Sequence, residues 1–250
     1  MRILVASDLH VDIGRQPDPN WFVDPDLFDV AFIPGDIANH AKTTLRYMLK
    51  FKEKVLSGKD MFFVSGNHDR WGSLFNSSEY FLQQIPGYIN RQVIDYKGFR
   101  ILGCTLWYKP SIHAHRSDWS DYEAITDWTN IRSEHDKDMR FIHEELQEGD
   151  IVLTHMLPCF ETIAPKFQND PYNQFFMTEL GELIKERKPK LWVHGHSHEQ
   201  MNYKIHDTLM IRNPRGYPRE IASPFNMWII DTDKIGEYDC VSMVDPTIMG

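Results

Sequence analysis

The chain contains the stretch Met61-Phe62-Phe63-Val64-Ser65-Gly66-Asn67-His68-Asp69, in which an apolar run stops at a glycine. An amide, an imidazole and a carboxylate follow that glycine in consecutive positions. A short apolar run bounded by turn residues predicts a buried β-strand, and Gly66 permits a tight bend with close backbone approach. Polar side chains just past the carboxyl end of a strand lie where open α/β sheets bind their ligands. A strand followed by an ordinary Asn-His turn is the alternative.

Four further apolar runs end in residues of the same kind. They are residues 2–6 followed by Asp8 and His10, 30–33 followed by Asp36, 151–153 followed by His155, and 191–193 followed by His196 and His198. A single Asp or Asn after a strand is usually a turn residue. Five such ends are hard to attribute to turns, because parallel strands place their carboxyl ends at one edge of a sheet. We therefore expect these side chains to converge on one site.

The spacing within two of these strand ends also favours metal binding. Residues i and i+2 of an extended backbone point the same way. Asp8 and His10 can therefore face one ion, and His196 and His198 can do the same. A glycine before Asp36 and another before His196 would let the backbone approach a crowded ionic centre.

The remaining elements predict an α/β protein. Apolar residues at helical spacing predict helices over residues 42–56, 74–85, 138–146 and 176–184. The order strand, helix, strand up to residue 64 implies parallel pairing with crossover helices. Residues 92–96 and 100–103 flank a hairpin-like turn, and short apolar runs after residue 204 predict an antiparallel second sheet. Without an internal repeat or linker, residues 1–250 are expected to form a single domain.

The composition argues against several classes of protein. The chain has 250 residues and a formal net charge of −9, which disfavours a broad surface for a nucleic-acid backbone. A phosphate substrate stays open, because bound metals can invert the local field. The three widely spaced cysteines argue against a zinc site or disulfide framework and favour a reducing cytoplasm. No apolar stretch approaches the roughly 18 residues of a spanning helix, so no membrane partner is expected.

The five strand ends together resemble the motif blocks of the calcineurin-like metallophosphoesterase superfamily. In order, the blocks are Asp8-x-His10, Gly35-Asp36, Gly66-Asn67-His68-Asp69, His155 and Gly195-His196-x-His198. Each block alone is weak, but the ordered combination from residue 8 to residue 198 is highly specific. The resemblance implies a four-layer α-β-β-α sandwich of two mixed sheets flanked by helices. The active site would lie at the carboxyl-terminal ends of the strands.

The resemblance also implies two metal ions, with Asp36 bridging them. One ion would be held by Asp8, His10, Asp36 and His198, and the other by Asp36, Asn67, His155 and His196. His68 would be the catalytic histidine that is not a ligand, and Asp69 would orient it. A mixed oxygen and nitrogen set without thiolate suits Mn, Fe, Zn, Co or Ni more than Ca or Mg.

The implied reaction is phosphate ester hydrolysis, in which a hydroxide that bridges the two metals attacks phosphorus in line. A protonated His68 would donate to the leaving oxygen. The chain reads Gly35-Asp36-Ile37-Ala38-Asn39 and carries Asp69 where protein phosphatases of the superfamily carry Glu. A phosphodiester or nucleotide-like small molecule is therefore the expected substrate. A nuclease acting on nucleic acid is one alternative, and a scaffold that has lost catalysis is another.

Two segments are candidates for substrate contacts. The aromatic stretch 106–134 would be a cap-like insert that stacks on a planar group, or else the core of a small subdomain. Its polar candidates are His113, Asn130 and Arg132. The loop that follows residues 209–211 offers Asn213, Arg215 and Tyr217, for which turn formation alone is the alternative.

Overall fold

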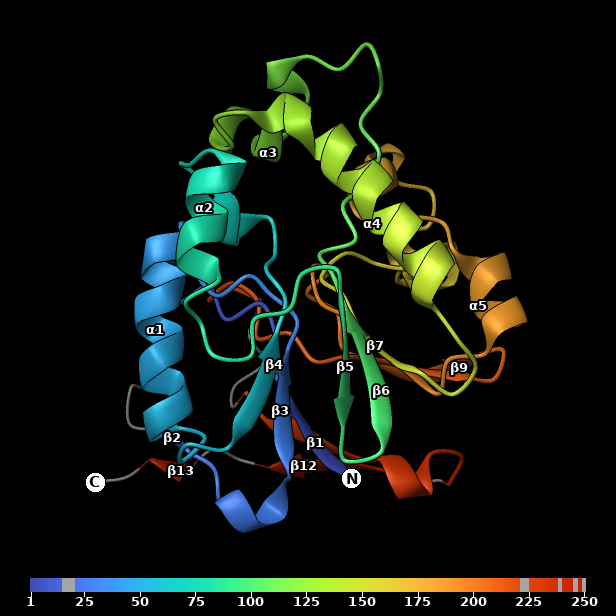
Figure 1. Ribbon diagram of the computed structural model, residues 1–250. Helices are drawn as coiled ribbons and strands as arrows, with labels where there is room; N and C mark the ends of the chain where they lie inside the picture. The colour runs from blue at the N-terminus through green and yellow to red at the C-terminus, as the bar shows by residue number, and fades with distance from the viewer. Residues whose placement is uncertain (15–20, 221–224, 238–239, 245–246, 249–250) are drawn as a thin grey trace.

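The computed structural model describes residues 1–14, 21–220, 225–237, 240–244 and 247–248, and two β-sheets form its centre (Figure 1). In the five-stranded sheet, β1, β3 and β4 are parallel, and β11 and β12 extend it in antiparallel fashion. The strands of this sheet, in spatial order, are β12 (Val241–Val244), β11 (Met227–Asp231), β1 (Arg2–Val5), β3 (Val30–Ile33) and β4 (Asp60–Phe63).

The six-stranded sheet has four parallel strands at its centre and one antiparallel strand at each edge. In spatial order its strands are β5 (Gln92–Tyr96), β6 (Phe99–Gly103), β7 (Ile151–Leu153), β8 (Leu191–Val193), β10 (Thr208–Arg212) and β9 (Met201–Ile205). A separate pair joins β2 (Trp21–Phe22) to β13 (Thr247–Ile248).

Helices cover the outer face of each sheet (Figure 1). The first sheet packs against α1 (Ala41–Lys54) and α2 (Phe75–Leu82). The second packs against α4 (Ile131–Glu145) and α5 (Gly181–Arg187). The short α3 (Ser120–Ala124) belongs to the segment between β6 and α4. These layers confirm the predicted α-β-β-α sandwich.

Alternating side chains explain how each strand serves two cores. Ile3 and Val5 of β1 point into the core between the sheets, whereas Leu4 packs on the helix side. In α1, Met48 and Phe51 recur at helical spacing and bury that face against the sheet. Full burial of an aliphatic or aromatic side chain is worth about 1.5–3 kcal/mol, so this pattern fixes which face of each element turns inward.

Eight short 3-10 helices complete the described chain. They are η1 (Pro25–Leu27), η2 (His68–Arg70), η3 (Arg116–Asp118), η4 (Trp128–Asn130), η5 (Phe160–Thr162), η6 (Pro165–Phe167), η7 (Pro171–Phe175) and η8 (Thr232–Lys234). No helix of the described residues is both long enough and apolar enough to cross a membrane.

Three predicted elements differ from the structure. Helix α4 begins at Ile131 rather than residue 138. The apolar spacing missed its first two turns because the buried face there carries the polar His135, whose Nδ1 hydrogen-bonds to the Trp107 carbonyl at 2.6 Å. Helix α5 begins at Gly181 rather than 176, because residue 176 pairs its backbone with Leu157 instead. The strands after residue 200 do not form one antiparallel sheet, since β9 and β10 join the second sheet and β11 and β12 the first.

Candidate metal centre

The side chains predicted to bind metals meet where the two sheets face each other. Three of their loops follow strands β1, β3 and β4 of the first sheet, and two follow β7 and β8 of the second. The site is therefore shared between two sheets rather than placed along one edge. All of these side chains are buried except that of His198, which is 15% exposed.

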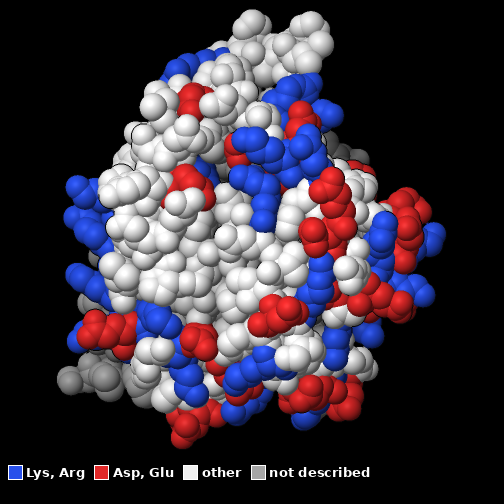
Figure 2. Space-filling model, in the orientation of Figure 1, with Lys and Arg blue, Asp and Glu red and all other residues white. Residues whose placement is uncertain are grey.

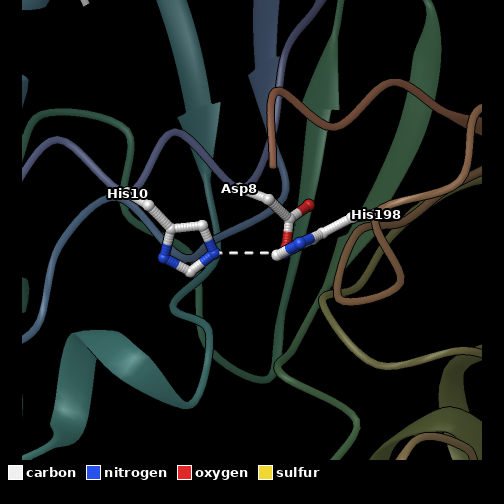
Figure 3. Close-up of side chains that lie close together, drawn as sticks. All are labelled: Asp8, His10 and His198. Atoms are coloured by element: carbon white, nitrogen blue, oxygen red, sulfur yellow. Dashed lines mark hydrogen bonds and ion pairs between the residues drawn. The ribbon is translucent and has the colours of Figure 1, made fainter. Parts of the chain in front are cut away.

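Asp8, His10 and His198 form the first cluster (Figure 3). The Nε2 atoms of the two histidines face each other at 3.1 Å. The Nε2 of His198 lies 3.7 Å from the Asp8 Oδ1. Three donor atoms that converge in this way could hold one metal ion.

Asp36, His155 and His196 form the second cluster. The His155 Nε2 lies 3.4 Å from the Asp36 Oδ1 and 3.0 Å from the Asn67 Oδ1. The other oxygen of Asp36, Oδ2, lies 3.9 Å from the His10 Nε2 in the first cluster. Asp36 therefore presents one carboxylate oxygen to each cluster, which is the arrangement a bridging ligand requires.

Hydrogen bonds at the far nitrogen orient two of these histidines. The Nδ1 of His155 donates to the Pro34 carbonyl at 2.7 Å, and the Nδ1 of His198 donates to the Glu220 Oε2 at 2.6 Å. Each bond places a proton on Nδ1 and directs Nε2 into the centre. Carbonyl and carboxylate partners play this part for most metal-binding histidines.

The donor atoms left over in the centre fit divalent metal ions. Among the described residues, the Asp8 Oδ2 and the His196 Nε2 are buried without a hydrogen-bond partner. A buried polar atom left unpaired costs about 1–3 kcal/mol, and a cation would satisfy both atoms. Carboxylate, imidazole and amide donors without thiolate match the predicted preference for a transition metal.

Burial and the Asp36 carboxylate set the protonation of the centre. Burial lowers the pKa of His10 to about 2, so this ring is neutral and available as a ligand. Burial also opposes protonation of His155, but the Asp36 carboxylate outweighs it and raises the pKa of His155 to about 9. Burial likewise opposes ionisation of Asp36, yet His155 and His68 hold its pKa well below the usual range.

The backbone of the centre is left-handed rather than extended. Asp8, His10, Asp36 and His196 have φ of 50°, 42°, 55° and 67°. Strand β1 already ends at Val5, so the predicted alternation of extended residues does not bring Asp8 and His10 together. A non-glycine residue in this region is uncommon, and such residues concentrate at functional sites.

The two glycines beside these loops allow their close approach. A Cβ on Gly66 would lie 2.0 Å from the Asp36 Oδ1, and one on Gly35 would lie 2.5 Å from the Gly66 nitrogen. Gly35 also has a φ of 84°, which favours glycine. The expected close backbone approach at both positions is confirmed.

His68 lies beside the centre, with its Nε2 4.0 Å from the Asp36 Oδ2. Its Nδ1 bonds to the Asn39 Oδ1 at 2.6 Å, and its Nε2 lies 3.3 Å from the Tyr217 hydroxyl. The ring stacks on Trp71 with centroids 3.7 Å apart. His68 is therefore held on three sides while Nε2 faces the centre.

The predicted role of Asp69 as the partner of His68 is wrong. Its carboxylate accepts from the backbone nitrogens of Gly66 at 2.8 Å and Asp36 at 2.9 Å, and from the Thr44 hydroxyl at 2.6 Å. These bonds direct Asp69 toward the loop after β3, where it fixes the backbone of Asp36. Asn39 occupies the place next to His68 that we assigned to Asp69.

A cavity of about 750 Å³ opens from the centre and from His68. Apart from the predicted metal ligands and His68, its lining consists of Trp71, Trp119, Ser120, Leu157, Ile163, Lys166, Phe167, Asp170, Asn173, Phe176, Ser197, Glu199, Tyr217 and Glu220. Half of these residues belong to the stretch 157–176. This irregular stretch was not predicted to line the site, although it lies just after His155 and carries four phenylalanines, of which Phe167 and Phe176 line the cavity.

Only Tyr217 of the six predicted substrate contacts lines this cavity. His113 is exposed, Arg132 is half-buried on α4, and the Asn130 Nδ2 donates to the Asp127 Oδ2 at 2.9 Å. The other two brace the backbone of the loop after β10. Asn213 donates to the Val5 carbonyl at 3.0 Å, and Arg215 donates to the Leu9 carbonyl at 2.6 Å. None of these five residues lines the cavity, and their contact with substrate stays a prediction.

The aromatic stretch 106–134 divides between the two interpretations offered for it. Trp107, Tyr108 and Tyr122 are buried in the core beside the second sheet, as the core interpretation expects. Trp119 instead lines the cavity while its ring stacks on Phe175, with centroids 4.6 Å apart.

Comparisons with known proteins identify the family of the chain. Residues 1–200 match the family model of the calcineurin-like phosphoesterases. No curated protein matches the chain.

Solved structures share the fold at low sequence identity. The phosphopantetheinyl hydrolase PptH from Mycobacterium tuberculosis is 14% identical with a TM-score of 0.64, over 98% of this chain and 96% of that one. The protein TT1561 of Thermus thermophilus is 12% identical with a TM-score of 0.54, over 98% of both chains. GAP50, the anchor in the inner membrane complex of Plasmodium, is 12% identical with a TM-score of 0.55, over 99% of this chain and 89% of that one.

Proposed function

The chain belongs to the calcineurin-like phosphoesterase family and is a phosphate-ester hydrolase, and we propose that it works with two divalent metal ions on a phosphodiester or nucleotide-like small molecule. One observation carries the proposal of two ions. The Asp36 carboxylate presents one oxygen to His155 at 3.4 Å and the other to His10 at 3.9 Å. A single buried carboxylate between two ligand clusters suits a pair of cations better than one.

Each ion would take a distinct set of residues. Asp8, His10, Asp36 and His198 would hold the first, and Asp36, Asn67, His155 and His196 the second. When bound, such ions polarise a phosphate ester and lower the pKa of water at the site. The donor chemistry suits Mn, Fe, Zn, Co or Ni.

His68 would move the proton in the proposed reaction. Asn39 accepts at Nδ1, so Nε2 is the atom left to exchange a proton with substrate. The same Nε2 lies toward Asp36 and Tyr217 inside the cavity. From there it would donate to the leaving oxygen, a role often worth about 10²–10⁴-fold in rate. The Tyr217 hydroxyl would restrict the ring or contact the phosphoryl group directly.

The cavity walls support a substrate with a planar group. Trp71, Trp119, Phe167 and Phe176 all line it. Stacking of a nucleobase on one aromatic ring is worth about 1–3 kcal/mol. Lys166 adds a cation at the outer wall, although it also pairs with Glu199.

A nuclease acting on a long nucleic acid is less well supported. The visible face in Figure 2 has a broad uncharged area, and along its lower part lysine and arginine alternate with aspartate and glutamate. Together with the net charge of −9, this pattern differs from the basic stripe that usually follows a phosphate backbone. A scaffold without catalysis is disfavoured because the whole predicted ligand set and His68 are present.

Two broader expectations stay part of the proposal. The first is a single domain with a cap-like insert around residues 106–134, to which Trp119 contributes a cavity wall. The second is a cytoplasmic location, for which the evidence is three free, buried cysteines.

A substrate panel tests the proposed function. Protein loaded with manganese would be assayed against bis(p-nitrophenyl) phosphate, cyclic nucleotides, nucleoside monophosphates and single-stranded DNA. We expect turnover of small diesters and little turnover of DNA. Two bound ions per chain, counted by mass spectrometry, are expected in the same preparation. Inertness toward every ester would contradict the proposal, and faster hydrolysis of DNA would favour the nuclease.

A further inference from the structure

We infer that Asp121 of α3 is a positioning residue whose carboxylate fixes the Asn67 amide together with the Trp71 and Trp119 rings. The helix lies in the segment between β6 and α4, above α2 in Figure 1, and it contributes no predicted metal ligand. This inference rests on the proposed function, because it treats Asn67 as a metal ligand.

Four side-chain donors converge on Asp121, whose side chain is fully buried. Its Oδ1 accepts from the Asn67 Nδ2 and from the Trp71 Nε1, both at 2.8 Å. Its Oδ2 accepts from the Tyr108 hydroxyl at 3.1 Å and from the Trp119 Nε1 at 3.3 Å. Three of these four donors belong to residues that line the cavity.

The bond to Asn67 selects one of two amide orientations. A carboxylate only accepts hydrogen bonds, so the Asn67 NH₂ group must face Asp121. The amide oxygen then points the opposite way, and it lies 3.0 Å from the His155 Nε2. Only this orientation offers a metal the oxygen rather than the nitrogen. Asp121 thereby prepares a ligand that it does not itself supply.

The bonds to the two indoles fix the cavity wall. An indole Nε1–H is a donor only, so each bond determines the rotation of its ring. Trp71 carries the stacking contact with His68 at 3.7 Å. Trp119 forms part of the wall beyond the centre. The same carboxylate therefore connects the metal ligand, the catalytic histidine and the substrate wall.

A purely structural role explains Asp121 poorly. A buried charge stabilises a fold less than a well-packed apolar residue of similar size. Asp138 is equally buried but pairs with the Arg91 guanidinium at 2.7 Å and the Trp107 backbone nitrogen at 3.0 Å. The four side-chain donors to Asp121 are all neutral, and none is a cation. Asp138 is therefore a matched control for a buried carboxylate away from the cavity.

The first test replaces the carboxylate by an amide. Asp121→Asn keeps the shape but places an NH₂ group among donors. We expect the affinity of metal-stripped protein for Mn²⁺, measured by calorimetry, to fall about 10–100-fold at one of the two sites, the usual effect of losing an outer partner. Asp138→Asn should keep wild-type affinity within about threefold. Wild-type affinity in folded Asp121→Asn would overturn the inference.

A second variant keeps the inference testable if Asp121→Asn does not fold. Trp71→Phe retains a ring beside His68 and removes one bond to Asp121. We expect KM for the preferred ester to rise about threefold to tenfold while both metals stay bound. An unchanged KM would overturn the role of Asp121 in orienting the wall.

The metal titration separates this inference from the proposed function. If wild-type protein binds two ions and hydrolyses no ester, the proposed function fails. The weaker binding of Asp121→Asn would still support the role of Asp121. If wild-type protein binds no ion at the centre, both fail together.

Discussion

The metal centre and the outer wall of the cavity are built in different ways. The centre lies on loops that directly follow five strands, and buried hydrogen bonds and two glycines hold it. Half of the wall comes from the irregular stretch 157–176, where Phe167 is 41% exposed and Lys166 is 60% exposed at its side chain. A rigid scaffold that positions variable loops commonly divides reaction from specificity in this way. The centre would thus set the reaction, and the wall would select the ester.

Loss of Asp36, the proposed bridging carboxylate, should have the largest effect on metal binding and turnover. In Asp36→Ala both clusters lose a ligand, so we expect both metals and all turnover to disappear. Metal content by mass spectrometry and hydrolysis of bis(p-nitrophenyl) phosphate would measure the change. Retention of two tightly bound ions would show that Asp36 does not bridge.

Loss of His68, the proposed catalytic histidine, should separate metal binding from reaction within the centre. We expect His68→Ala to keep both metals and to lower kcat about 10²–10⁴-fold, because a general acid is removed. Parallel metal analysis and steady-state kinetics would check this. Departure of the metals with the imidazole would make His68 a ligand.

Metal binding at the centre should depend on pH. The carboxylate of Asp36 overcomes burial and raises the pKa of His155 to about 9, so below that pH a metal must displace a proton. With one proton released, we expect Mn²⁺ affinity to fall about tenfold per pH unit on going from pH 9 to pH 7. Calorimetry across this range would measure it. An affinity that does not change with pH would contradict the assignment of His155.

Asn39 should have a smaller effect on turnover than His68. Asn39→Ala removes the acceptor at the His68 Nδ1, and we expect kcat to fall about 10–100-fold with metals retained. Asn39→Asp restores an acceptor and should recover most of the rate. Equal activity of Asn39→Ala and wild type would show that His68 does not depend on its hydrogen bond to Asn39.

The outer wall should show the smallest effect, and only in KM. Phe167→Ala removes one exposed ring of the cavity, and the loss of about 1 kcal/mol of stacking would raise KM roughly fivefold with kcat unchanged. Phe160→Ala is the matched control, since Phe160 is 44% exposed in the same segment and does not line the cavity. A large fall in kcat for Phe167→Ala would contradict the proposal that the wall affects only substrate binding.

The sequence predicted the centre well because its residues follow strands directly. A strand end is a local pattern, and the packing of parallel strands brings such ends together. The prediction that Asp69 orients His68 was wrong, because residues adjacent in the chain need not have side chains in contact. The turn η2 directs its carboxylate to the loop after β3, and Asn39, 29 residues from His68, contacts the imidazole instead.

The outer wall was not predictable in the same way. Residues 157–176 have no helical or alternating period that would assign them a face. The spacing predicted Phe176 as the start of a helix. Instead its backbone carbonyl accepts from the Leu157 nitrogen, and its ring centroid lies 4.6 Å from that of His196. Asn130 and Arg132 were chosen for their chemistry alone, and tertiary packing placed them outside the cavity.

The division of the centre between two sheets has a mechanical consequence. Asp36 and Asn67 follow strands of the five-stranded sheet, whereas His155 and His196 follow strands of the six-stranded sheet. An ion bound by all four side chains would connect the two sheets and oppose their separation. Cations would then raise the melting temperature, because a ligand bound only by the folded chain stabilises it in proportion to the logarithm of its concentration.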